Sequence, residues 1–335
     1  MNTSPIGVTM ASLQSLGVPA ALEVARSAEA LGYTSAWVAE ASGPEAFSQL
    51  AALSGAAPTL SLGTGVLALQ LRPPSLVAMA GATLQTLVPD ADVLLGIGIS
   101  SPVVTTRWHG VPYGERPLER VREYVTLLKA CLSGERVDFE GEFYRVKGFR
   151  LGVRLGVRRP KVLVAALNPG MLRLAGEVSD GVVLNYLPAT HVAWSVEQVR
   201  AGAAKAGRDD GDVPVYAYVH AGVCERADGI DAARRDLFSY AVVDAYARSF
   251  ERAGFGEEVA AIRAAHTAGD REGAVAAVSD RMVDAIDVMG DAAQVEATFK
   301  EYVDAGVDVP VLMALPWGPD RRAVVDATLA AAVGA

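Results

Sequence analysis

The sequence predicts an α/β protein whose parallel strands close into a (β/α)8 TIM barrel with insertions. Short apolar runs and amphipathic helical segments alternate through most of the 335 residues. Repeated βα units force the strands to run parallel, and the eight strands expected here are the number that closes a barrel. Two of the apolar runs, at residues 60–66 and 93–98, end in glycine-rich turns, as the ligand-binding end of a barrel requires.

Each expected strand is a short apolar run bounded by turn formers. The strands are predicted at residues 6–10, 35–40, 60–66, 93–98, 161–166, 181–185, 213–224 and 309–314. The helices between them are predicted at residues 18–31, 45–57, 73–87, 116–132, 170–178, 189–206, 292–305 and 320–333. Proline in the first turn, as at Pro19, and glycine at the end, as at Gly32, support these limits.

Two stretches break the alternation. Residues 135–144 predict a β-hairpin that turns at Glu140-Gly141, and residues 228–289 are mostly helical, with breaks near Gly254, Gly269 and Gly273. We therefore predict one barrel domain over residues 1–335, with a hairpin and basic loop at about 134–160 and a helical insertion at about 226–290.

The competing fold is an open doubly wound sheet. Such a sheet carries a Gly-x-Gly-x-x-Gly turn that opens a helix. Gly96-Ile-Gly98 lacks the third glycine and continues into Ser100-Ser101-Pro102, so the barrel is favoured.

Composition narrows the class of protein. The net charge of −9 argues against a nucleic-acid binder, and no apolar run approaches the length of a membrane span. Cys131 and Cys224 stand without metal-ligand spacing, and the first residues lack the pattern of a signal peptide. These features predict a cytoplasmic protein with no membrane or nucleic-acid partner.

The carboxyl ends of the strands hold the functional side chains of a barrel. Here they carry mostly small and apolar residues, which suits a flat cofactor better than a metal or a sugar phosphate. Glu40 could act as an acid or base, or could form a cap or ion pair at the start of a helix. Asn168 begins a strand-to-helix turn that could bind a phosphate, or could cap that helix in the ordinary way.

The histidines share no spacing, so no metal site is expected, and His191, His220 and His266 are interpreted as structural. His109 is kept as a candidate because it follows Ser100 and Ser101 closely, although the adjacent Trp108 could be simple core packing. Residues 145–161 hold five arginines, two lysines and no acidic residue; this basic block either attracts anions or is a solvated loop.

An ordered set of short motifs carries a family resemblance. The motifs lie at residues 37–40, 47–53, 62–66, 95–103, 107–110, 120–124, 134–135, 141–144 and 172–181. Together they resemble the bacterial luciferase-like proteins, and most of all the branch that uses the deazaflavin coenzyme F420. The resemblance is strong over about residues 5–200 and weakens after Pro214.

The resemblance implies a barrel that is usually dimeric, with a non-proline cis peptide at Gly65–Val66 that supports the coenzyme ring. The residues expected to bind the cofactor are Thr64, Gly65, Val66, Gly98, Ile99, Ser100, Ser101, Ala166, Asn168, Gly170 and Met171. Residues 168–171 would receive the phosphate, and the basic block would meet the acidic glutamate tail. The expected catalytic residues are Glu40 and His109.

Two departures from the family pattern matter. Many relatives have a histidine after the acidic residue of the second strand, but Glu40 is followed by Ala41. Either Glu40 or His109 replaces that histidine, or the reaction needs no proton relay there. The loop at residues 99–101 lacks the carboxylate of some sugar-phosphate oxidising relatives, which disfavours that substrate class.

Three functions follow from the resemblance. The first is hydride transfer between coenzyme F420 and a small organic substrate, by a homodimer. The second is a monooxygenase that uses reduced FMN and oxygen, with a separate reductase supplying the reduced cofactor. The third is a non-catalytic barrel that binds a flavin or metabolite. The substrate is not identified, and its specificity is expected in the loops near residues 186–194 and 240–258.

Overall fold

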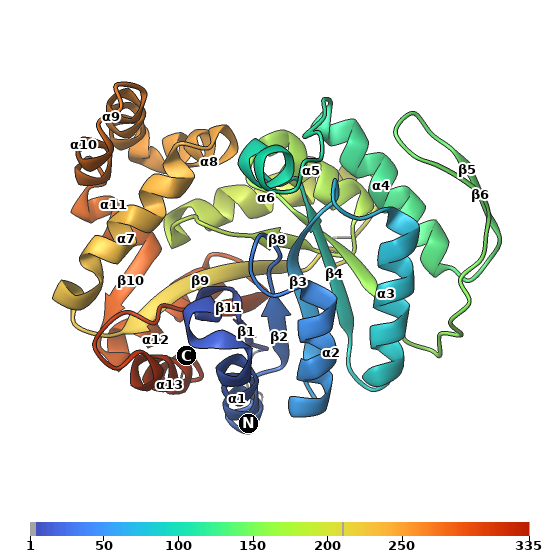
Figure 1. Cartoon of the computed structure of the whole chain (residues 1–335), viewed down its shortest axis with the longest axis horizontal. Helices are drawn as coiled ribbons and strands as arrows, with labels where there is room; N and C mark the ends of the chain where they lie inside the picture. The colour runs from blue at the N-terminus through green and yellow to red at the C-terminus, as the bar shows by residue number, and fades with distance from the viewer. Residues whose placement is uncertain (1–4, 210, 335) are drawn as a thin grey trace.

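Eight parallel strands form a closed barrel in the computed structural model, which describes residues 5–209 and 211–334 (Figure 1). In barrel order they are β1 (Gly7–Thr9), β2 (Ser35–Val38), β3 (Ser61–Ala68), β4 (Val93–Gly98), β7 (Lys161–Ala165), β8 (Val182–Leu184), β9 (Val215–Val223) and β11 (Val309–Ala314). The pairings of β8 with β9 and of β11 with β1 close the ring. The predicted barrel is confirmed, and the open sheet is excluded.

The helices of the βα units surround this barrel. They are α1 (Gly17–Ala30), α2 (Ala46–Ala56), α3 (Pro74–Leu87), α4 (Pro117–Leu132), α5 (Pro169–Val178), α6 (Ala189–Lys205), α12 (Ala292–Asp304) and α13 (Arg321–Ala332). Their starts follow local chemistry: Asp291 and Asp320 accept hydrogen bonds from first-turn amides of α12 and α13. Proline occupies the first turn of α3, α4 and α5.

The first insertion is an antiparallel hairpin of β5 (Val137–Glu140) and β6 (Arg145–Phe149). The connection at residues 141–144 begins at the predicted turn, but the second strand lies entirely beyond the predicted limit of residue 144, at Arg145–Phe149. Glu123 of α4 accepts hydrogen bonds from the backbone amides of Phe143 and Tyr144, at 2.8 and 2.5 Å. The hairpin is thereby fastened to the side of α4.

The second insertion is the predicted helical segment, and it lies on the opposite side of the barrel from the hairpin (Figure 1). It comprises α7 (Arg226–Ala241), α8 (Asp244–Phe250), η3 (Glu251–Phe255), α9 (Gly256–Thr267), α10 (Arg271–Ala276) and α11 (Asp280–Ile286). The sequence did not reveal β10 (Asp287–Gly290), which pairs with the end of β9. β10 follows α11 directly, so no turn residue marks the change from helix to strand.

Aromatic rings fill the inside of the barrel. Trp37, which is fully buried, contacts Tyr216 and Tyr218 with ring centroids 5.2 and 6.5 Å apart. A Cβ at Gly63 would lie 2.3 Å from the Trp37 ring, so only glycine fits at that point of β3. The interior is therefore a packed core, and a ligand site belongs at the carboxyl ends of the strands.

Candidate cofactor site at the barrel mouth

A bulge in β3 marks the mouth of the barrel. The Gly65–Val66 peptide is cis, as predicted, and the pairing of β3 with β4 shifts register between Thr64 and Leu67. The Tyr218 hydroxyl donates to the Gly65 carbonyl at 3.2 Å, and the Thr64 hydroxyl donates to the Gly96 carbonyl at 3.0 Å. The bulge is thus braced from both the barrel interior and the neighbouring strand.

The glycines of β4 make room for this bulge. A Cβ at Gly96 would lie 2.1 Å from the Thr64 carbonyl oxygen, and a Cβ at Gly98 would lie 2.8 Å from Val66 Cγ2. Sequence analysis interpreted these glycines as space for a flat ligand. In the structure they accommodate the adjacent strand, which brings Val66 against the end of β4.

The residues that follow β4 and β7 lie at the same mouth. Ile99, Ser100 and Ser101 are half-buried, whereas Ala166 is buried. The Ser101 backbone carbonyl accepts a hydrogen bond from the Thr105 amide at 3.0 Å. This bond anchors η2 (Val103–Trp108), a short helical segment that sequence analysis did not predict.

η2 delivers His109 to the end of β2. His109 Nε2 lies 2.6 Å from the Ala41 carbonyl oxygen, so Nε2 carries the proton and a neutral ring has its acceptor at Nδ1. His109 therefore stands beside residue 41, the position at which the family resemblance implies a histidine. Trp108 is 56% exposed, so its interpretation as core packing is wrong.

Glu40 lies in an ion pair with Arg72, which comes from the segment between β3 and α3. Arg72 Nε is 3.0 Å from Glu40 Oε2, and Arg72 Nη2 is 2.7 Å from Glu40 Oε1. The hydrogen bond that Arg72 donates to Glu40 raises the pKa of Arg72, and Glu40 also accepts a hydrogen bond from the Ala46 amide at the start of α2. This is the ion-pair alternative that the sequence left open, and a catalytic role for Glu40 stays a prediction.

The N-terminus of α5 lacks a side-chain cap. Asn168 occupies the cap position, but its Nδ2 donates to the Ala245 carbonyl at 3.1 Å and its Oδ1 accepts from Arg252 Nη2 at 2.7 Å. The interpretation of Asn168 as an ordinary capping residue is therefore wrong. Gly170 and Met171 are in the first turn of α5, where backbone amides point out of the helix and can bind an anion.

One arginine of the helical insertion reaches this helix end. Arg252 donates a hydrogen bond to Asn168 and lies over the Trp194 ring, 5.8 Å from its centroid. Burial and the charge of Arg248 lower the pKa of Arg252. Sequence analysis missed Arg252 because only the folded insertion brings it to residue 168.

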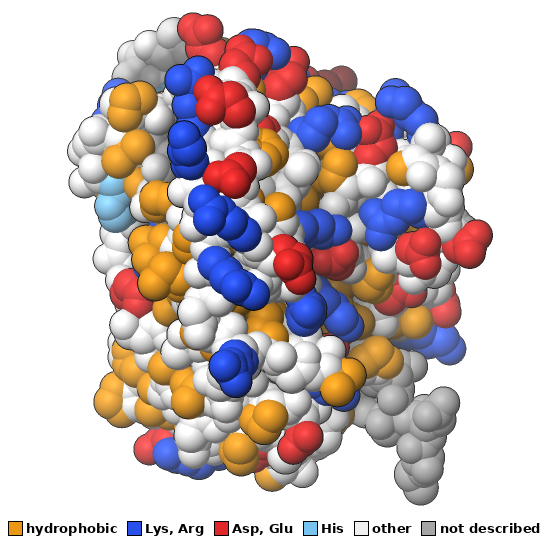
Figure 2. All heavy atoms as spheres, turned by 90° about the vertical axis from the view of Figure 1, so that its right-hand side faces the viewer, with side chains coloured by type: hydrophobic (Ala, Val, Ile, Leu, Met, Phe, Trp, Pro, Cys, Tyr) orange, Lys and Arg blue, Asp and Glu red, His pale blue; other side chains and the backbone are white. Residues whose placement is uncertain are grey.

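Most of the basic block lies at the other end of the barrel. Arg158 and Lys161 pair with Asp92, the residue before β4, at 2.7 and 2.8 Å, and Arg159 donates to the Leu132 carbonyl at the end of α4. Figure 2 shows this side of the molecule, where acidic side chains lie among the lysines and arginines. The basic block lies near the amino end of β7, whereas the N-terminus of α5 follows the carboxyl end of β7. This placement does not support the expected contact between the basic block and the tail of a coenzyme whose phosphate is bound at α5.

Two of the remaining histidines pack as expected. His191 stacks on Trp194 with ring centroids 4.7 Å apart, and His266 meets the Phe238 ring at 5.6 Å.

The rings of Tyr186 and Tyr240 are 3.8 Å apart, and Tyr186 is buried, so these aromatic side chains of the expected specificity loops pack inside the protein. His220 lies in a buried cluster with two aspartates that the sequence did not reveal.

The eight-stranded α/β barrel, the bulged third strand and the uncapped helix end at its mouth together place the protein among the α/β-barrel enzymes. Residues 4–309 match the family described as luciferase-like monooxygenase, and the chain belongs to this family. The resemblance noted from the short motifs is thereby confirmed at the level of the family.

Named relatives agree with this assignment. The chain is 30% identical over 301 residues to the 5,10-methylenetetrahydromethanopterin reductase of Archaeoglobus fulgidus, covering 88% of this chain and 89% of the relative. The solved structure of a coenzyme F420-dependent tetrahydromethanopterin reductase from Methanopyrus kandleri superposes with a TM-score of 0.80 at 22% identity, over 98% of this chain and 97% of that chain. An F420-dependent secondary alcohol dehydrogenase gives a TM-score of 0.74 at 18% identity, over 98% and 97% of the two chains.

No helix within residues 5–209 and 211–334 has the length and hydropathy that a membrane span requires. The cytoplasmic location stays a prediction.

Proposed function

We propose that this protein is an oxidoreductase that transfers a hydride between coenzyme F420 and a small organic substrate. The observation that carries the proposal is the bulge of β3 between Thr64 and Leu67, which Tyr218 braces and which brings Val66 against the end of β4. Two of the solved structures, the tetrahydromethanopterin reductase from Methanopyrus kandleri and the secondary alcohol dehydrogenase, are named as F420-dependent and support the choice of coenzyme.

The residues present fit such a coenzyme. The first-turn amides of Gly170 and Met171 would bind its phosphate, with Arg252 adding positive charge. Val66 and the half-buried residues 99–101 would contact the ring, since the glycines of β4 hold the bulge against this loop. The bound deazaflavin supplies the carbon that gives or accepts the hydride.

His109 is the residue we propose for the accompanying proton. Its Nε2–H bond to the Ala41 carbonyl fixes the ring and leaves Nδ1 to hold or accept a proton at the substrate's heteroatom. Glu40 then acts as a positioning residue, because Arg72 occupies both of its oxygens and joins the end of β2 to the start of α3.

Ligand binding tests the coenzyme. We expect oxidised F420 to bind purified protein at micromolar concentrations and to raise its melting temperature. A deazaflavin without the phosphate should bind at least about tenfold more weakly, because it leaves the α5 amides unused. No affinity for F420 would contradict the proposal.

The alternatives have distinct readouts. Oxygen uptake that depends on reduced FMN and a substrate would favour the monooxygenase, which agrees with the description of the family. Tight F420 binding with no turnover of any carbonyl, alcohol or one-carbon carrier tested would favour the non-catalytic barrel. A separate reductase is required only in the monooxygenase case.

The expected homodimer also remains a proposal. The helix α3 exposes the large apolar side chains Leu76, Met79 and Leu87, which are 45%, 48% and 50% exposed. This face is a candidate contact between two copies of the chain. Light scattering coupled to gel filtration would test it, with Met79→Glu expected to shift a dimer toward monomer.

A further inference from the structure

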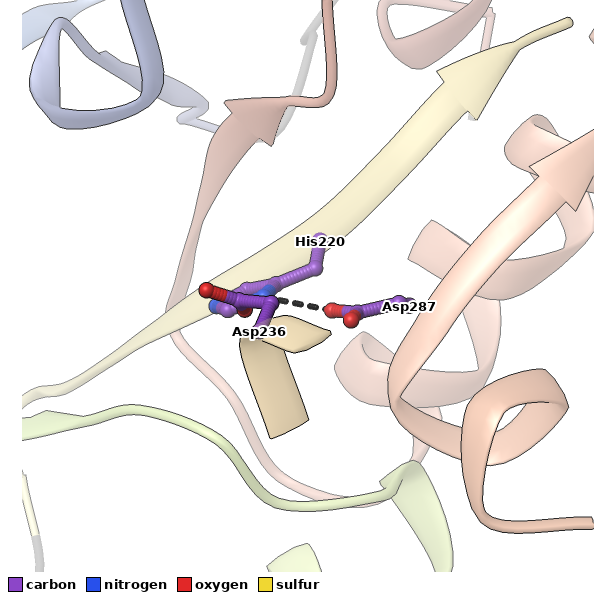
Figure 3. A group of neighbouring side chains, drawn as sticks. All are labelled: His220, Asp236 and Asp287. Carbon is purple, nitrogen blue, oxygen red and sulfur yellow. Dashed lines mark hydrogen bonds and ion pairs between the residues drawn. The ribbon is translucent and has the colours of Figure 1, made fainter. Parts of the chain in front are cut away.

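Three ionisable side chains from separate parts of the fold converge where the helical insertion meets the barrel (Figure 3). His220 comes from β9, Asp236 from α7 and Asp287 from the first residue of β10. His220 and Asp287 are cross-strand partners, and His220 Nδ1 lies 2.9 Å from Asp287 Oδ1. One nitrogen or oxygen from each of the three residues lies within 4.8 Å of the others.

The hydrogen bonds around His220 fix which nitrogen carries a proton. Its Nε2 lies 2.8 Å from Asn185 Oδ1, and the Tyr186 backbone amide donates to the same oxygen at 2.9 Å. Since the Tyr186 amide can only donate, this bond identifies the atom as the amide oxygen of Asn185. Nε2 must therefore donate to it, and a neutral His220 directs the lone pair of Nδ1 toward Asp287 Oδ1.

The aspartates lack positive charge of their own. Asp287 is fully buried, and its Oδ2 has no hydrogen-bond partner among the described residues. Asp236 Oδ2 accepts a hydrogen bond from the Tyr186 hydroxyl at 2.8 Å, which orients it but does not neutralise it. Among the described residues no lysine or arginine pairs with either aspartate, and carboxylates in a largely buried cluster are paired with a cation or bind a metal.

We propose that His220 Nδ1, Asp236 and Asp287 form a binding site for one divalent transition-metal ion, of the zinc or manganese type. One imidazole and two carboxylates match the ligands of these ions, whereas calcium and magnesium prefer oxygen ligands alone. Asn185 and Tyr186 hold the ligands from behind, as the outer hydrogen bonds of metal sites do. The ion would balance both carboxylates and give Asp287 Oδ2 a partner.

The position of the site indicates a structural role. Asp236 lies in the first helix of the insertion and Asp287 in its last strand, while His220 belongs to the barrel. An ion bound to all three would fasten both ends of the insertion to β9. This inference is independent of the coenzyme, because none of its ligands is among the residues assigned to F420.

Metal content and thermal stability test the site in the full chain without a histidine tag. Protein treated with EDTA and then dialysed against Zn²⁺ or Mn²⁺ should hold about one equivalent by elemental analysis, and its melting temperature should rise by several degrees. Asp236→Asn should weaken the affinity at least about 100-fold, and Tyr186→Phe about tenfold. Asp284→Asn is the matched control, since Asp284 is an exposed aspartate of the same insertion, and it should bind like wild type.

Two results would overturn the proposal. One is wild-type protein that binds neither ion and melts at the same temperature with EDTA as with either ion, in which case the cluster is held by a proton on His220. The other is Asp236→Asn protein that still binds one equivalent with wild-type affinity, which would place the ion elsewhere. Asp287 is fully buried and its substitution risks misfolding, so the half-buried Asp236 carries the test.

Discussion

The double-mutant cycle of Glu40 and Arg72 distinguishes the two roles considered for Glu40. The variants are Glu40→Gln, Arg72→Gln and the double mutant. The pair makes two charge-assisted hydrogen bonds, of 3.0 and 2.7 Å, and the two side chains are only 12% and 19% exposed. Exposed ion pairs contribute about 0.2–1 kcal/mol, whereas hydrogen bonds to buried charged groups contribute about 1.5–3 kcal/mol.

Partial burial places this pair between those limits, so we expect a coupling free energy of about 1–2 kcal/mol. The cycle removes the other contacts of Arg72, with Glu45 and the Phe47 ring, because they are lost equally in both Arg72 variants. The assay is urea unfolding of the four proteins, followed by kcat and KM with reduced or oxidised F420.

If Glu40 is a positioning residue, Glu40→Gln and Arg72→Gln should reduce kcat/KM by similar factors, each within about tenfold, or about 1.4 kcal/mol of activation free energy. A coupling free energy near zero would refute the ion-pair argument. A loss of about 1,000-fold in kcat for Glu40→Gln, with near wild-type kcat for Arg72→Gln, would show that Glu40 itself moves the proton.

Three further predictions concern the mouth and the base of the barrel. Gly96→Ala should lower the free energy of unfolding by about 2 kcal/mol or more, because the added Cβ would lie 2.1 Å from the Thr64 carbonyl oxygen. Gly55→Ala is the control in α2, where an added Cβ meets nothing within 4 Å, and it should raise the free energy of unfolding by about 0.5–1 kcal/mol; equal urea midpoints of the two variants would contradict this reasoning. Arg252→Gln should weaken F420 binding about tenfold at low salt, by isothermal titration, with Arg271→Gln as an unaffected control; no loss would remove Arg252 from the phosphate site. Burial opposes ionisation of Asp92, but Lys161 and Arg158 outweigh burial and lower the pKa of this carboxyl group. The ionised Asp92 therefore stabilises the fold above the ordinary carboxyl pKa, and this stabilisation is lost as pH falls through the lowered pKa, so the urea midpoint of wild type should fall more steeply on acidification than that of Asp92→Asn.

Local pattern was sufficient to predict the barrel. Each strand is a short apolar run with its own turn residues, so position and type could be inferred without knowledge of distant contacts. β10 was missed because residues 287–290 continue from α11 without a turn, and pairing with β9 alone makes them a strand. The position of the basic block also depends on topology. Residues that precede a strand of the barrel lie at the amino end of that strand, and the basic block precedes β7.

The candidate site was only partly accessible to sequence reasoning. The cis peptide at Gly65–Val66 came from family resemblance, because no local rule distinguishes this glycine from others in strands. Arg252 and Tyr218 reach the mouth from segments far along the chain, and no periodicity links them to their partners. The same holds for His220 and Asp287, whose adjacency depends on the register of β10.

The two hydrogen bonds of Asn168 join the barrel to the insertion, since one goes to the Ala245 carbonyl and the other to Arg252. A phosphate seated on α5 would therefore touch two parts of the molecule at once. If phosphate binds more tightly when the insertion holds Arg252 at Asn168, thermodynamic reciprocity requires that bound phosphate stabilise this position of the insertion to the same extent. Retention of the coenzyme would then depend on contacts between α5 and the insertion as well as on the barrel.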